Sequence, residues 1–112
     1  MQVKWLRTAL LNLEHEAEYI RQDNPAAARL IVQRVRSAVS KLQENPAMGR
    51  PGRITGTREL VVPDTRYIIP YRVRHEYNRI EILRVFHCSR KPPEHWWPVF
   101  SLVQTGRLGG AA

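Results

Sequence analysis

Residues able to take part in acid–base chemistry gather in the segment RVFHCSRK, at residues 84–91. His87 is the natural candidate for a general acid or base, because the ordinary pKa of imidazole lies near neutrality. No carboxylate stands close to it in the sequence, so a catalytic dyad is not indicated locally. A histidine at a strand end also commonly makes a backbone hydrogen bond and does no chemistry. The sequence alone leaves both interpretations open.

Arginines are spaced along the predicted strands so that several can share one face of a sheet. Side chains alternate between the two faces of a strand, so Arg58, Arg72 and Arg84 form a cluster if each points away from the helices. A guanidinium suits phosphate or carboxylate ligands, because its donors form a planar fork. The alternative is a set of solvated salt bridges, which contribute little stability. Possible rim residues are Arg50, Arg53 and Arg90, and possible acidic partners are Glu59, Asp64 and Glu81.

The remaining candidate ligands match a metal site poorly. His87, Cys88 and His95 follow no familiar zinc spacing and lack a fourth ligand, so we expect neither a metal nor another cofactor. Cys88 is the only cysteine, which excludes an internal disulfide and agrees with a reducing compartment. Trp96 and Trp97 are expected to pack the C-terminal segment over the sheet edge, with base stacking or a protein interface as the alternative.

Charge is the strongest bulk property of the chain. Its 112 residues carry a formal net charge of +8, and the sequence pI is near 10.6. Such a domain attracts anionic partners such as nucleic acid, a ribosome or an acidic protein, although surplus arginine can also serve solubility alone. No stretch is long and apolar enough to cross a membrane, and the start lacks the apolar core of a signal peptide. We therefore expect a cytoplasmic protein.

Two amphipathic helices are predicted in the first half of the chain. The first is expected to be capped by Thr8 and to run to about Gln22. The second follows Asn24 as its N-cap, with Pro25 in the first helical position, and ends near Asn45. Its apolar residues recur every three or four positions. Helices joined by so few residues form an antiparallel hairpin with one shared apolar face.

Strands are predicted at residues 2–6, 58–62, 67–74 and 80–87. Short polar segments separate the last three, which should therefore be antiparallel neighbours. Pro70 is the discordant residue, because it cannot donate to a ladder of hydrogen bonds. We expect a bulge there, or a side of the strand whose N–H needs no partner.

These elements predict an α+β fold. An N-terminal strand is followed by an antiparallel helical hairpin and then by a three-strand antiparallel meander. The hairpin packs on one face of a small sheet and leaves the other face open. The domain is expected to span residues 1–98, and residues 99–112, which lack periodicity, are expected to form a mobile C-terminal tail.

Three segments in the second half resemble, in their order and spacing, the RelE/ParE superfamily of toxins from type II toxin–antitoxin modules. They are GTRELVV at 56–62, YIIPYRV at 67–73 and IEILRVFHCSRK at 80–91. The resemblance runs from about Val3 to Lys91 and includes the helical hairpin. In the ParE-like branch the last strand ends in a histidine, two small residues and an arginine, which HCSR matches at His87 and Arg90.

The resemblance implies a growth-inhibiting toxin of the plasmid-stabilisation type, held inactive by a cognate antitoxin. RelE-like members cut messenger RNA in the ribosome, whereas ParE-like members inhibit DNA gyrase. For a chain this basic, the antitoxin is expected to be acidic and amphipathic, and to fold as it binds.

Several positions depart from the pattern of the RNA-cutting relatives. Ile68 stands where they carry an arginine, and Met48 and Val61 where they place lysines or a glutamate. Trp96 lies near the position of a C-terminal tyrosine that some of them use. The resemblance therefore favours gyrase inhibition over ribosome-dependent cleavage of messenger RNA.

The two functions give the same residues different roles. In a gyrase inhibitor, a surface that recognises target or antitoxin is formed by Arg58, Arg72, Arg84, His87 and Arg90. In an endoribonuclease, His87 is the acid or base and Arg90 stabilises the phosphate. A basic binding module without toxicity is the further alternative.

Overall fold

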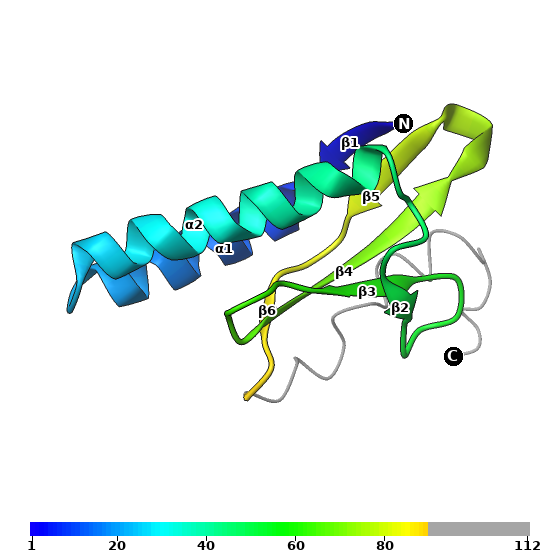
Figure 1. Cartoon of the computed structure of the whole chain (residues 1–112). Coiled ribbons are helices and arrows are strands. Elements are labelled where there is room, and N and C mark those ends of the chain that lie inside the picture. Colours follow the sequence, from blue (N-terminus) through cyan, green and yellow to red (C-terminus); the bar gives the residue numbers. More distant parts are fainter. Residues whose placement is uncertain (90–112) are drawn as a thin grey trace.

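The computed structural model describes residues 1–89 and folds them into a helical hairpin packed on one sheet (Figure 1). The helices are α1 (Arg7–Arg21) and α2 (Pro25–Ser40), with short 3₁₀ helices η1 (Lys41–Gln43) and η2 (His75–Tyr77). The strands are β1 (Gln2–Trp5), β2 (Arg50–Pro51), β3 (Arg58–Val61), β4 (Tyr67–Arg74), β5 (Arg79–Ile82) and β6 (Phe86–His87). The predicted α+β fold is confirmed. The expectations for Arg90, His95, Trp96, Trp97 and the tail at 99–112 lie outside the described residues.

The two helices start for different physical reasons. As predicted, Asn24 caps α2, because its side-chain oxygen accepts a hydrogen bond from the Ala27 N–H at 3.1 Å. The prediction of Thr8 as the cap of α1 is wrong, since α1 follows Leu6, which makes no side-chain cap. Instead the Leu6 N–H donates to the Ile82 carbonyl at 3.0 Å, so a bond to the sheet fixes where α1 begins. Neither helix is long and apolar enough to cross a membrane.

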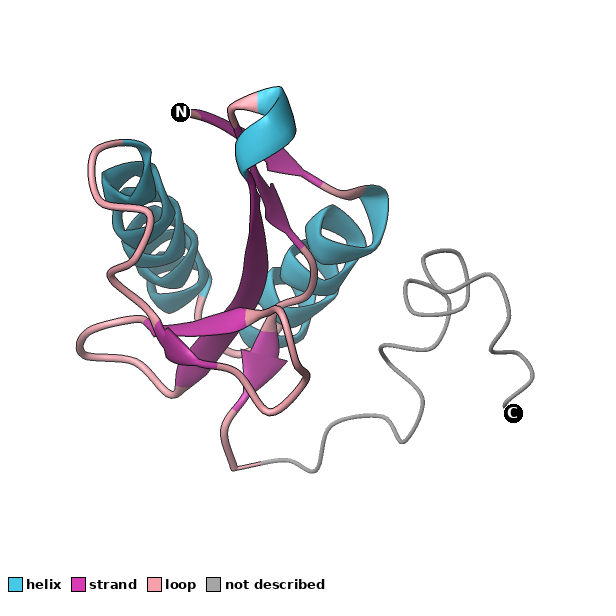
Figure 2. Ribbon diagram, turned by 90° about the vertical axis from the view of Figure 1, so that its right-hand side faces the viewer, coloured by secondary structure: helices cyan, strands magenta, loops and turns pink. Residues whose placement is uncertain are grey.

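The hairpin covers the face of the sheet to which every second residue of the strands, mostly apolar, points. α1 and α2 lie side by side along the sheet, and Figure 2 shows both nearly along their axes beside the twisted strands. The buried core draws on α1 (Ala9, Leu13), α2 and η1 (Val35, Ala38, Val39, Leu42), β3 and its end (Leu60, Val62), β4 (Tyr67, Ile69, Tyr71) and β5 (Ile80, Ile82). Burying this shared apolar surface is the main force that holds the hairpin on the sheet.

The sheet has the order β1-β5-β4-β3-β2, and β6 also pairs with β4. β3, β4 and β5 form the predicted antiparallel meander. β1 adds at the edge and runs parallel to β5. A parallel pair needs a long crossover connection, which here includes the whole hairpin. The chain also forms β2, which is not among the predicted strands, and β2 pairs with β3 at the far edge.

The last predicted strand, at residues 80–87, is divided into β5 and β6. The break lies opposite Pro70 of the neighbouring strand β4. The register against β4 shifts by one residue between the two strands, from Tyr71 opposite Ile82 to Tyr67 opposite His87. The N–H of the residue after β5 donates to the Pro70 carbonyl at 2.9 Å, so the side on which Pro70 lacks a donor faces this break. The segment from β5 to β6 thus holds one more residue than the stretch of β4 that it faces, which is a bulge of the kind expected at Pro70.

Candidate recognition surface

The sheet face turned away from the helices holds a buried carboxylate surrounded by arginines. Glu81 accepts a hydrogen bond from Arg72 Nε at 2.7 Å and forms ion pairs with Arg79 Nη2 at 2.8 Å and with Arg74 Nη1 at 3.8 Å. Its side chain is only 6% exposed. The guanidinium carbons of Arg74 and Arg79 each lie 5.0 Å from the centre of the Tyr77 ring. We call these five residues the Glu81 cluster. The cluster contains three guanidinium cations and one carboxylate, and the contacts with the carboxylate fix the positions of the cations.

The carboxylate of Glu81 stays ionised despite its burial. Burial alone would raise its pKa, but the hydrogen bond from Arg72 and the charges of Arg72, Arg79 and Arg74 outweigh this and hold the pKa below its usual value. Arg74 and Arg79 stand directly opposite each other on neighbouring strands, an arrangement that is unfavourable for like charges. Glu81 offsets that repulsion, so the arginine positions depend on this one acid.

A second buried carboxylate lies on the same face, because Glu59 stands opposite Pro70, two residues from Arg72. Glu59 accepts from Arg50 Nη2 at 3.2 Å, and from both Nε and the backbone N–H of Arg53 at 3.1 Å. Burial opposes its ionisation, yet the contacts with Arg53 and Arg50 keep its pKa lowered. We call Glu59, Arg50 and Arg53 the Glu59 cluster. Both arginines are about half exposed, at 55% and 51%, and can reach a partner.

Apolar residues flank the two clusters on this face. Val61 stands directly opposite Ile68, and both continue the alternation that runs through Glu59 and Arg72. Val61 is 50% exposed, which is high for a valine in a sheet. The face therefore combines fixed guanidinium groups with exposed apolar surface, the mixture that protein interfaces use.

Arg58 does not join this face, which corrects the expectation that Arg58, Arg72 and Arg84 point away from the helices together. Arg58 stands opposite Tyr71, so it lies on the core side of the sheet, whereas Arg72 points to the other side. Its Nη1 donates to the Gly49 carbonyl at 2.7 Å. The Tyr71 hydroxyl accepts from the Gly49 N–H at 2.9 Å and donates to the Pro46 carbonyl at 2.7 Å. Burial raises the pKa of Tyr71. Arg58 and Tyr71 thus fix the loop that leads into β2.

Arg84 also lies apart from Arg72, in the three-residue break between β5 and β6. Its Nη1 donates to the Leu83 carbonyl at 2.8 Å, and its side chain is partly buried. That burial lowers the pKa of the guanidinium. A continuous strand would have fixed the direction of Arg84 by alternation. The break at Pro70 removes that rule.

His87 sits on the core side of the sheet, where the sequence left its direction open. Its ring meets the Tyr67 ring edge-on, with 5.2 Å between ring centres. Its Nδ1 accepts from the Ser89 N–H at 3.2 Å. The Tyr67 hydroxyl in turn donates to the buried Glu16 carboxylate at 2.9 Å. These contacts are the packing and backbone bonding expected of a structural histidine. Its role as a contact or catalyst stays a prediction.

The arginine cluster predicted from the sequence did not include Arg74 or Arg79. The usable signal was Arg79-X-Glu81, because residues two apart on a strand share a face. Among residues 1–89, no group of histidine, cysteine and acidic side chains converges on a possible metal position.

The fold places the chain beside small α+β proteins from solved toxin–antitoxin structures. A chain of the chromosomal ParDE TA system from P. aeruginosa matches with a TM-score of 0.70 and 30% identity, over 78% of this chain and 95% of that one. A chain of the RelBE2 toxin–antitoxin complex from Mycobacterium tuberculosis matches with a TM-score of 0.52 and 26% identity, over 77% and 95%.

Sequence comparison then gives the family. The model described as ParE toxin of type II toxin-antitoxin system, parDE, matches residues 3–92, and the chain belongs to this family. It is 46% identical to the candidate toxin Y4kP of Sinorhizobium fredii, over 82% of this chain and 93% of the relative. It is 35% identical to toxin RelE2 of Caulobacter vibrioides, over 80% and 97%. The resemblance to RelE/ParE toxins is confirmed, and the protein is a toxin of the type II toxin–antitoxin class.

Proposed function

We propose that this toxin inhibits DNA gyrase in the cytoplasm and is neutralised there by a cognate antitoxin. The observation that carries the proposal is the ParE family match, which extends over residues 3–92 and so includes nearly all of the described chain. The likeness to a ParDE structure, with the higher TM-score of the two solved complexes, supports it.

The chemistry of the open sheet face also favours recognition over RNA cleavage. Cleavage through the 2′-hydroxyl needs a base, an acid and donors around the phosphate. The carboxylates of Glu59 and Glu81 are poor acids or bases at neutral pH, because bound arginines lower both pKa values. Val61 and Ile68 lie where RNA-cutting relatives are expected to carry charged residues, and they leave this part of the face apolar.

A ribosome-dependent messenger RNA endonuclease is the second candidate, favoured by the 35% identity to toxin RelE2. In that function His87 would act as the acid or base and Arg90 as the phosphate stabiliser. The edge contact of His87 with Tyr67 places the imidazole on the core side, away from Arg72. A nuclease built on this chain would therefore assemble its site without the Glu81 cluster.

The test is inducible expression in a bacterial host, followed by two assays on the purified toxin. One measures gyrase supercoiling, and the other maps cuts in messenger RNA in a translation extract. Supercoiling inhibition with intact RNA supports the proposal. RNA cuts at the ribosomal A site with unaffected supercoiling would replace gyrase by the ribosome as the target. A chain that causes no growth defect and is inactive in both assays would instead be a binding module.

The antitoxin is expected to bind the open sheet face through acidic side chains. The arginines of the Glu59 and Glu81 clusters supply fixed donors, and the apolar surface beside them suits an amphipathic segment that folds on binding. Affinity for the antitoxin encoded beside the toxin should then fall steeply as salt rises. Arg50→Gln should weaken binding and flatten the salt dependence, whereas Arg29→Gln, at an exposed position of α2, should do neither. A complex that is insensitive to salt would show that apolar burial dominates instead.

A further inference from the structure

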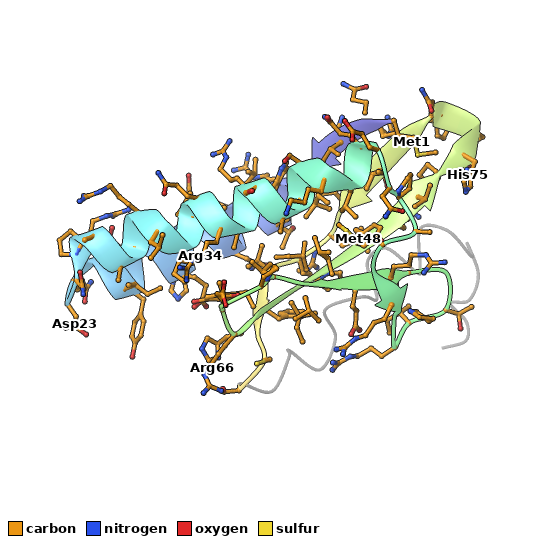
Figure 3. The ribbon with its side chains drawn as sticks, viewed as in Figure 1. Met1, Asp23, Arg34, Met48, Arg66 and His75 are labelled. Atoms are coloured by element: carbon orange, nitrogen blue, oxygen red, sulfur yellow. The ribbon has the colours of Figure 1, made fainter. Side chains whose placement is uncertain are left out.

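A cavity of about 350 Å³ lies between the loop that leads into β2 and the end of β4. Figure 3 shows His75 at the tip of the β4–β5 hairpin, and the loop passes beside this end of β4 in Figure 1. The lining includes Arg58 and His75, with apolar wall from Pro46, Ala47, Pro51 and Val73. We call this cavity the Arg58 pocket. No residue of the Glu59 or Glu81 cluster lines it, so it is separate from the recognition surface described above.

Arg58 lacks the carboxylate partner that the other arginines of the sheet have. The arginines on β2, β4 and β5 each pair with Glu59 or Glu81, whereas Arg58 forms no ion pair with any carboxylate among residues 1–89. No acidic residue lines the Arg58 pocket either. The side chain is partly buried, so the guanidinium gives up part of its hydration without gaining an opposite charge. A bound anion supplies that charge.

The guanidinium of Arg58 is held in place and still has donors to offer. Its Nη1 donates to the Gly49 carbonyl at 2.7 Å, which is its one hydrogen bond to residues 1–89. Among the partly or fully buried residues in that range, only Arg79 Nε is sealed from solvent without a partner, so the unbonded nitrogens of Arg58 stay open to solvent. The Tyr71 hydroxyl holds the same loop through Gly49 and Pro46. A fork fixed beforehand loses little entropy when a ligand binds.

The chemistry of the pocket favours a phosphate group over other anions. His75, the first residue of η2, brings an imidazole that donates a hydrogen bond from a protonated ring nitrogen. A carboxylate offers two oxygens, which one guanidinium fork satisfies, whereas a phosphate has further acceptor oxygens for a second donor. The volume lies within the range of about 300–1,000 Å³ of small-molecule sites, so the apolar wall leaves room for the organic part of a phosphate ester.

We propose that the Arg58 pocket binds a phosphate group, carried by a free phosphate ion or a small phosphate ester, with Arg58 as the main ligand and His75 as the second donor. Arg58 and Val73 lie on the core side of the sheet, so the site is on the opposite side from the Glu59 and Glu81 clusters. The loop that forms one wall also carries Arg50 and Arg53 of the Glu59 cluster. An occupied pocket therefore ties this loop to β4 and steadies that part of the recognition surface.

The test is an NMR titration of the full-length toxin with inorganic phosphate, with AMP and with adenosine, at an ionic strength kept constant with sodium chloride. Phosphate and AMP should shift the amide signals of the pocket residues, and adenosine should not. Ala47→Glu places a carboxylate in the pocket and should weaken phosphate binding by about tenfold or more, the worth of a charge-assisted hydrogen bond. Ala26→Glu adds the same charge at an exposed position at the other end of α2 and should leave binding unchanged.

Two further pairs of variants test the two donors. Arg58→Gln should also weaken binding by about tenfold or more, whereas Arg29→Gln, which removes the same charge from α2, should not. Because Arg58→Gln also removes the bond to the Gly49 carbonyl, Ala47→Glu is the decisive variant. His75→Gln should weaken binding by about threefold to tenfold, and His15→Gln, on α1, should leave it unchanged.

Tighter binding of AMP than of inorganic phosphate would identify a phosphate ester as the ligand, and equal affinities would identify the free ion; either result supports the site. The remaining outcomes overturn it. Phosphate that acts no differently from chloride would leave the pocket without this ligand. Wild-type affinity in Ala47→Glu, or signal shifts confined to the Glu59 and Glu81 clusters, would place the anion on those arginines instead. Adenosine that binds as tightly as AMP would show an apolar site that does not recognise phosphate.

Discussion

Replacing Glu81 by glutamine should destabilise the toxin by about 2–3 kcal/mol. Removing one partner of a fully buried ion pair costs about 3–5 kcal/mol, because it leaves the other charge buried and uncompensated. Here the side chains of Arg72, Arg74 and Arg79 keep 13%, 24% and 29% of their exposure, so water can partly replace the lost carboxylate. Glutamine retains the shape and one acceptor oxygen. The expected loss therefore lies just below the range for a fully buried pair.

The measurement is the free energy of unfolding from chemical denaturation, with Glu76→Gln as the matched control. Glu76 also pairs with Arg74, at 3.1 Å, but its side chain is 59% exposed. The same neutralisation there should leave the free energy of unfolding nearly unchanged. If both variants lose the same small amount, Glu81 does not hold the arginines in place. The account of a fixed cationic surface would then be wrong.

The pH dependence supplies a second check on Glu81. Its pKa is lower in the folded chain than in the unfolded chain, so its ionised form stabilises the fold at pH values above the unfolded pKa. That contribution disappears as the pH falls through the folded pKa. The difference in stability between the wild type and Glu81→Gln should be constant near neutrality and should shrink in acid, below about pH 4.5. A difference that grows in acid would contradict the stated cause.

Three further changes test other parts of the structure. Tyr67→Phe removes the hydrogen bond to the buried Glu16 carboxylate and should cost about 1–2 kcal/mol in a denaturation experiment; an unchanged value would show that this bond contributes nothing. Gly49→Ala places a Cβ 2.7 Å from Tyr71 Cε1, so the melting temperature should fall by the equivalent of about 1–3 kcal/mol of folding stability. His87→Gln should lower supercoiling inhibition by less than about tenfold. If the toxin is instead an endoribonuclease and His87 is its acid or base, the same change should lower RNA cleavage by about a hundredfold or more.

The helical hairpin and the meander could be predicted because local rules decide them. The spacing of apolar residues and the cap at Asn24 specify α2 without help from the rest of the chain. The start of α1 could not be predicted in this way. Thr8 is a good capping residue, but the hydrogen bond from Leu6 to Ile82 begins the helix earlier. A contact between residues so distant in sequence leaves no local signal.

The arginine cluster was predicted only in part, because strand register decides which side chains share a face. Alternation along one strand correctly separates Arg72 from Tyr71. It does not say which of Arg58 and Glu59 stands on the side of Arg72, since a slip of one residue exchanges them. The structure puts Glu59 there. The acid that was treated as a competing partner for the arginines is thereby an organising residue of the surface.

Buried carboxylates give this basic molecule a surface that is prepared for binding. A free arginine loses side-chain entropy when it binds, which weakens the complex. The guanidinium groups of Arg72, Arg79, Arg50 and Arg53 are already held by hydrogen bonds and ion pairs of 2.7–3.2 Å, so less entropy remains to be lost. Each cluster still has more cations than anions, and its attraction for an acidic partner survives. Salt should therefore weaken the binding of an acidic partner at these two clusters.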